Sequence, residues 1–160
     1  MTPREHAIAL LEFTRSYTLG LLKDIPEGRY THQVCPTANH ILWVMGHLAG
    51  TDAWIAGEVG ASKVSVPEAI VKAFGMNSKP SASGNPPVGE VKRAFESSRA
   101  ALIEWFKSAP DSALKLNLKE KTGGFTTDPI DAMLKIAWHE GLHAGQIAEV
   151  RKSLGLPPSM

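Results

Sequence analysis

The chain has 160 residues, of which 43% are hydrophobic and 21% charged, and its formal net charge is +1. This composition is typical of a folded globular protein, so we expect residues 1–160 to form a single domain. Basic residues are spread along the sequence, which argues against a nucleic-acid partner. Since neither a membrane-spanning run nor a secretory leader is apparent, we expect a cytoplasmic protein with no membrane partner.

The N-terminal segment predicts a long helix over about residues 3–24. Thr2 and Glu5 are placed for a capping box, and Pro3 suits the first helical turn. Pro26 then lies in a loop. The helix is amphipathic, with a mainly apolar stripe at Ala7, Leu10, Leu11, Thr14, Thr18, Leu21 and Leu22.

A second helix is predicted over about residues 38–60, capped by Thr37 or a near neighbour. It contains few charged residues, so we expect it to be well buried. Its apolar side includes Ile41, Val44, Leu48 and Ile55. Residues 60–87 are irregular, with a short helix in "SVPEAIVKAFG" and a polar loop in "NSKPSASGNPP".

A third long helix is predicted over about residues 88–108, and a fourth over about 129–154 with Asp128 as its N-cap. One face of the third helix contains Val91, Phe95, Ser98, Leu102 and Trp105. Between these helices, residues 114–127 alternate leucine with polar residues, which indicates an extended arm or a short hairpin. The chain is therefore predicted to be all-α, a four-helix bundle with irregular loops between helices two and three and before helix four.

The last predicted helix contains the letters HEGLH at residues 139–143, which match the H-E-x-x-H pattern of zinc peptidases. Histidines four residues apart lie on one helical face and can present both imidazoles to one metal ion. The extended peptidase pattern requires glycine and histidine where this chain has Gln146 and Glu149. No later helix supplies a glutamate ligand, so a peptidase is disfavoured.

The third metal ligand must come from upstream of this helix. His47 is the best choice because it lies in the middle of the charge-poor second helix, which a bundle can place opposite the last one. His40 lies in the first turn of its helix, where a role toward a loop or a dimer face is favoured over ligation. His6 and His32 are expected on the surface. Three neutral imidazoles leave room for one or two waters, which suits Zn, Ni or Fe(II).

With these residues the chain resembles the DinB-like (DinB/YfiT-like) superfamily of metal-binding four-helix bundles. The matching segments are "NHILWVMGHLAGTDAW" in the second helix and "WHEGLHAGQIAEVRKSLGLP" at the end of the chain. The resemblance implies a metal-binding triad at His47, His139 and His143 and a homodimer. It also implies kinship with transferases and isomerases that use mycothiol, bacillithiol or related low-molecular-weight thiols.

Three polar residues are candidates for roles behind the ligands. Gln146 lies one turn beyond His143 and is placed either to hold a ligating imidazole or a water, or to bond the helix to a loop. Asp52 follows His47 closely and either supports the site or lies on the helix surface. Glu140 is rotated by about 100° from its histidine neighbour, so we expect it toward solvent or a dimer face. There a structural salt bridge is favoured over a general-base role.

Together with the resemblance, the sequence predicts a divalent-metal protein that, if it is an enzyme, carries out thiol transfer or hydrolysis on a small electrophile. Its partner is a small-molecule substrate or thiol, bound between the second and last helices, where Trp54 or Trp138 can form a wall. The alternative is a non-catalytic, metal-stabilised dimeric bundle that acts as a stress-associated binding module.

Overall fold

The computed structural model describes residues 1–158, which contain five α-helices and no β-strand. The helices are α1 (Pro3–Leu22), α2 (Ile41–Val59), α3 (Glu68–Phe74), α4 (Val88–Ser108) and α5 (Pro129–Ser153). The all-α prediction is confirmed, and the fifth helix is the short α3, which lies where a short helix was predicted in "SVPEAIVKAFG". Within residues 1–158, none of the helices combines the length and apolarity needed to cross a membrane.

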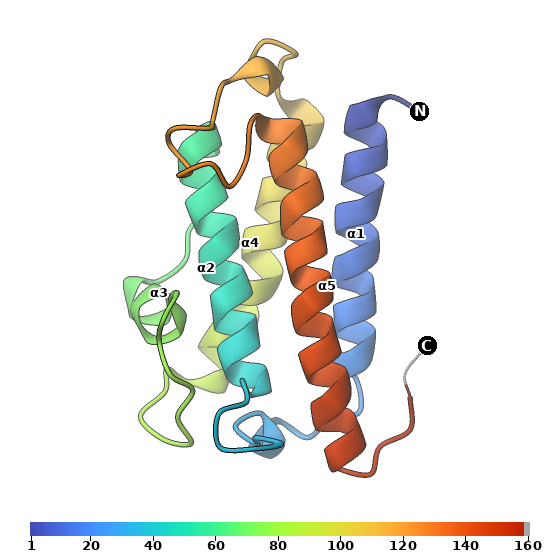
Figure 1. Cartoon of the computed structure of the whole chain (residues 1–160), viewed down its shortest axis with the longest axis vertical. Helices are drawn as coiled ribbons and strands as arrows, with labels where there is room; N and C mark the ends of the chain where they lie inside the picture. Colours follow the sequence, from blue (N-terminus) through green and yellow to red (C-terminus); the bar gives the residue numbers. More distant parts are fainter. Residues whose placement is uncertain (159–160) are drawn as a thin grey trace.

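The four long helices lie side by side, while α3 lies on the outer side of α2 (Figure 1). Helix α1 packs against α5 and α4, and α2 packs against α4 and α5. The buried apolar side chains form two clusters at opposite ends of these helices, represented by Leu42 and Ile147 in one and by Leu11 and Phe106 in the other. The layer between the two clusters is not apolar, because it contains the buried charged residues described below.

The helix starts follow local capping chemistry. Thr2 accepts a hydrogen bond from the backbone of Glu5, whose carboxylate accepts one from the backbone of Thr2, as a capping box requires. The cap of helix α2 is His40, a near neighbour of Thr37, and its Nδ1 accepts from the backbone N–H three residues later. The Nε2 of His40 lies 2.9 Å from the carbonyl oxygen of Ser81, so this side chain faces a loop as predicted.

The apolar faces agree with the predicted stripes except at a few positions. Leu10 is 39% exposed on α1, and near the end of α4 Phe106 is fully buried while its neighbour Trp105 is half-buried. Two arginines occupy the same buried faces, Arg15 on α1 and Arg99 on α4. The sequence pattern did not predict them, because arginines are seldom fully buried unless they are paired.

The predicted extended arm or hairpin at residues 114–127 is wrong, because this segment contains no strand: it begins in the short 3-10 helix Ala113–Lys115 and forms turns at residues 119–124. Gly123 and Gly124 have φ values of 59° and 84°, a left-handed conformation that glycine adopts without strain. The hydroxyl of Thr122 donates to the carbonyl of Thr126 and accepts from its N–H, so side-chain bonds replace a strand ladder.

Helix α3 docks on α2 at Gly46. A Cβ atom added to Gly46 would overlap the ring of Phe74, which is almost fully buried. The glycine therefore lets the Phe74 ring lie directly against the backbone of α2, one residue before the candidate ligand His47. The same residue, Phe74, offers its carbonyl oxygen to the His47 ring at 3.0 Å.

Replacing Gly46 with alanine should therefore loosen α3. We expect Gly46→Ala to lower the free energy of unfolding by about 1–3 kcal/mol, the usual cost of overpacking, although alanine itself favours a helix by about 1 kcal/mol. Gly57→Ala is the matched control on the same helix, because its Cβ would meet no atom within 4 Å. Urea unfolding monitored by circular dichroism checks both variants, and equal or higher stability of Gly46→Ala would contradict this account of the packing.

Candidate metal centre

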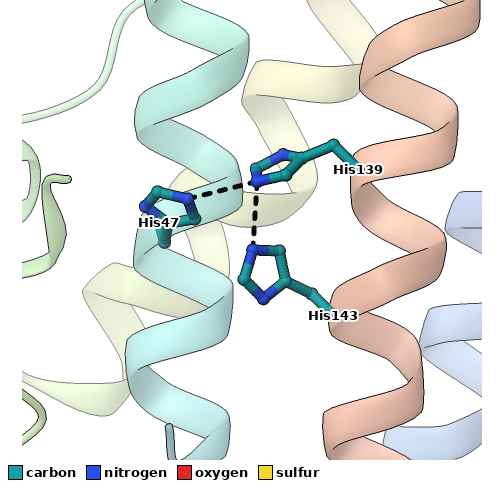
Figure 2. A group of neighbouring side chains, drawn as sticks. All are labelled: His47, His139 and His143. Carbon is teal, nitrogen blue, oxygen red and sulfur yellow. Dashed lines mark hydrogen bonds between the residues drawn. The ribbon is translucent and has the colours of Figure 1, made fainter.

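Three histidines from two helices point toward a common centre. His47 comes from the middle of α2, and His139 and His143 are one turn apart on α5 (Figure 2). The Nε2 of His139 lies 3.3 Å from the Nε2 of His47 and 3.0 Å from the Nε2 of His143. One ligand atom from each of the three rings lies within 4.8 Å of the other two. The structure therefore brings the three predicted ligands together.

The spacing of these nitrogens fits a metal coordination sphere. With metal–nitrogen distances of about 2.0–2.1 Å, two ligands of a tetrahedral ion are about 3.3 Å apart, and two adjacent ligands of an octahedral ion are about 2.9 Å apart. The two closest pairs here, at 3.3 and 3.0 Å, fall in this range. Both geometries leave at least one position that no histidine fills.

The hydrogen bonds around the rings also favour a metal. The Nδ1 of His47 lies 3.0 Å from the carbonyl oxygen of Phe74, and the Nδ1 of His143 lies 2.9 Å from the Oε1 of Gln146. Both partners are oxygens that accept hydrogen bonds, so each neutral ring holds its proton on Nδ1 and a lone pair on Nε2. These two lone pairs face His139, which has at most one Nε2 hydrogen to share between them. A divalent cation satisfies all three nitrogens.

The environment keeps the three rings neutral. Burial is the main factor that lowers the pKa of His139 to about 4, and the nearby His143 and His47 contribute to the same shift. Burial also lowers the pKa of His47 and of His143. The Nδ1 of His139 is buried without a hydrogen-bond partner in the described residues, so nothing there holds this ring in one tautomer. Neutral imidazole is the form that binds metal.

Two side chains next to the triad, Trp43 on α2 and Gln146 on α5, hold the histidine rings in place. Trp43, one turn before His47 on α2, stacks on its imidazole with centroids 4.6 Å apart, and its ring centroid lies 5.9 Å from that of His143. Gln146 bonds the imidazole of His143 and also accepts from the side chain of Asn39 at 3.3 Å. Gln146 thus makes both hydrogen bonds that the sequence offered as alternatives, one to a ligand ring and one to a loop.

The predicted aromatic walls are placed differently. Trp54 lies on the same side of α2 as His47 and lines a pocket beside it. Trp138 is 61% exposed, and no ring contact joins it to the histidines. The aromatic residue that does contact the triad is Trp43, which the sequence analysis did not single out.

A buried cluster of two arginines and two carboxylates lies in the layer between the apolar clusters. Each long helix contributes one member: Arg15 from α1, Asp52 from α2, Arg99 from α4 and Glu140 from α5. Arg99 lies 2.8 Å from Asp52 and 2.6 Å from Glu140, and Arg15 lies 2.8 Å from Glu140 and 3.5 Å from Asp52. All four side chains are at most 9% exposed. We call this group the ion quartet.

The quartet balances its own charges. Burial by itself would raise the pKa of Glu140, but the positive charges of Arg99 and Arg15 outweigh burial and lower that pKa below its ordinary value. Arg15 also lies over the ring of Phe95 at 3.7 Å and donates to its carbonyl oxygen, and Ser98 donates to Asp52 at 3.2 Å. The two carboxylates and two guanidinium groups are therefore paired, which buried ions require.

Two predictions are corrected here. Glu140 faces neither solvent nor a dimer partner, because it is fully buried in the quartet, where it makes the structural salt bridge that was favoured over a general-base role. Asp52 is not a helix-surface group and contacts no ligand ring, because both its oxygens face arginines. Arg15 and Arg99 were missed, although each interrupts an otherwise apolar helical face. Two basic and two acidic residues at such positions are a signal of a buried ion cluster.

Removing one charge from the quartet should be costly. We expect Glu140→Gln to lower the free energy of unfolding by about 3–5 kcal/mol, because it leaves an arginine charge buried without a counter-ion. Glu149→Gln is the control on the same helix, because Glu149 forms only an exposed pair with Lys152 and its loss should cost less than about 1 kcal/mol. Denaturant unfolding of metal-free protein measures both, and a similar small loss in the two variants would argue against a stabilising quartet.

A family model described as the DinB superfamily matches residues 10–147, which include all three histidines and the whole ion quartet. Neither the comparison with curated proteins nor that with solved structures gives a match. The chain belongs to the DinB superfamily.

Proposed function

We propose that His47, His139 and His143 bind one divalent metal ion, with Zn, Ni and Fe(II) as the candidates, and that this centre carries out thiol transfer or hydrolysis on a small electrophile. The observation that supports the proposal is the convergence of three Nε2 atoms with too few hydrogens to satisfy one another. A bound ion supplies Lewis acidity, which polarises a thiol, a water or a substrate oxygen.

The position of the triad favours a catalytic over a structural ion. His47 and His139 are half-buried, so solvent and small molecules can reach the side of the bundle where the rings meet. Three protein ligands leave a coordination position open, whereas structural zinc sites are closed by four. In addition, the ion quartet already joins α2 to α5, so a metal between these two helices adds no connection that the fold lacks.

Each surrounding residue has a definite part in this proposal. The carbonyl of Phe74 and the side chain of Gln146 hold the Nδ1 hydrogens of two ligands and so aim their lone pairs at the ion. Trp43 covers one face of the His47 ring and excludes water from it. Glu140 has both oxygens bound by arginines, which makes it a poor proton acceptor for the reaction. Activation of the nucleophile would then fall to a bound ion rather than to Glu140, which suits a thiol or a water.

A calorimetric titration tests the thiol part of the proposal. Zinc-loaded protein and metal-free protein are each titrated with several low-molecular-weight thiols. We expect heat of binding from the zinc-loaded protein and none from the metal-free protein. Heat of equal size without zinc would contradict a metal-centred thiol site, and the absence of heat with every thiol would leave hydrolysis as the proposed reaction.

Loss of one ligand should abolish tight metal binding. We expect His47→Ala to bind zinc more than about 100-fold more weakly than the wild type, because the loss of a ligand exceeds the 10–100-fold effect usual for an outer hydrogen-bond partner. His6→Ala is the control, since His6 is exposed and bonds only within α1. Metal content after dialysis against a zinc buffer is the measurement, and an unchanged content in His47→Ala would exclude the triad.

We further propose that the protein forms a homodimer through α1 and α5. These neighbouring helices expose apolar side chains at helical spacing: Leu134, Trp138 and Leu142 on α5, and Phe13 and Tyr17 on α1. A monomer seldom exposes so many large apolar residues on adjacent elements, and a second copy with the same face can cover them.

A charge in the middle of this face should separate the copies. We expect Trp138→Glu to reduce the mass in solution from that of two chains to that of one, because the carboxylate would be buried without a partner. Leu116→Glu, at an exposed apolar residue in the segment after α4, is the control and should leave the mass unchanged. Light scattering on a size-exclusion column decides, and a wild-type protein of single-chain mass would contradict the homodimer.

A further inference from the structure

An apolar pocket lies directly beside the triad, between α2 and α3. Its volume is about 200 Å³, and the side toward α2 is formed by His47, Thr51 and Trp54, which share one helical face. The opposite side is formed by the end of α3 and the residues that follow it, including Phe74 and Met76. The pocket and the triad therefore share the imidazole of His47.

The chemistry of the lining selects an uncharged group. Among the residues that the structure describes, the pocket lining includes no charged side chain. The hydroxyl of Thr51 already donates to the carbonyl of its own helix, at a distance of 3.0 Å. Around the pocket Trp54, Val71 and Met76 expose large apolar side chains, which is unusual unless something covers them. A sugar or a carboxylate would lose its hydration here without gaining a partner.

The pocket is large enough for an aromatic ring. An apolar cavity of about 150 Å³ is known to bind benzene, and this pocket is somewhat larger. The absence of a side chain at Gly50 provides part of this space, because a Cβ added there would meet no atom within 4 Å. A larger residue at this position would fill the pocket without straining the helix, since Gly50 lies inside α2.

We propose that this pocket binds the apolar part, a phenyl ring or a short branched alkyl group, of a small uncharged substrate whose polar end lies at the triad. The inference rests on the proposed function in one respect, the position of the polar end. Within that function it names the substrate class: a small apolar thiol or electrophile occupies the pocket, and a sugar-based or strongly charged thiol does not.

The first test uses metal-free protein, so that it does not depend on the metal. Binding of 4-fluorotoluene is followed by ¹⁹F NMR. The wild type should bind it, and Gly50→Leu should bind it at least about tenfold more weakly, because burial of a phenyl-sized group contributes more than a tenfold effect. Gly57→Leu, at a glycine on the same helix that is equally open but outside the pocket, should bind like the wild type. The affinity of Gly50→Ala for 4-fluorotoluene should lie between those of the wild type and Gly50→Leu.

The second test uses zinc-loaded protein and calorimetry. Phenylmethanethiol should bind at least about tenfold more tightly than 2-mercaptoethanesulfonate, and Gly50→Leu should remove this difference while Gly57→Leu keeps it. If phenylmethanethiol binds through zinc but 4-fluorotoluene does not bind and Gly50→Leu has no effect, the pocket proposal is overturned and the metal centre stands. If 4-fluorotoluene binds as expected and zinc adds nothing to either thiol, the pocket stands and the thiol-transfer part of the proposed function fails.

Discussion

Two guanidinium groups and two carboxylates, one from each long helix, meet in a neutral, buried contact in the middle of the bundle. Each of the four long helices contributes one charge, so no helix can slide or rotate without leaving an ion unpaired in an apolar interior. Apolar packing above and below tolerates small shifts far better than paired charges do. The ion quartet therefore fixes the register of the helices, while the two apolar clusters provide most of the stability.

The register of the helices determines where the three histidines of the metal centre lie. His139 directly precedes Glu140 on α5, and His47 lies five residues before Asp52 on α2. With Glu140 and Asp52 held by the same two arginines, the histidines on the neighbouring faces of the two helices are directed at one another (Figure 2). The ring orientations are then set by local contacts, in which Phe74 reaches His47 because Gly46 lets α3 lie against α2. Small changes far from the rings can thus misplace the ligands.

The sequence alone predicted the helical class, most helix boundaries and the three histidines that the structure brings together. These features depend on local periodicity, capping and spacing along one helix, together with the resemblance for His47. Prediction from the sequence failed where the surroundings of a side chain depend on residues of another helix that packs against it. The angle between His139 and Glu140 gives the direction of Glu140 but not its surroundings, and its partner Arg99 is 41 residues away in the chain. The turns at residues 114–127 were missed because alternating leucines also fit a strand, whereas here side-chain bonds and two left-handed glycines decide the path.

A crystal structure of the zinc-loaded protein, with anomalous diffraction at the zinc edge, will show whether the three Nε2 atoms form one half-open metal site. We predict a single strong anomalous peak about 2.0–2.1 Å from the Nε2 atoms of His47, His139 and His143, with at least one further ligand that does not come from the protein. A peak at another position, or an ion bound by only two of these histidines, would contradict the account.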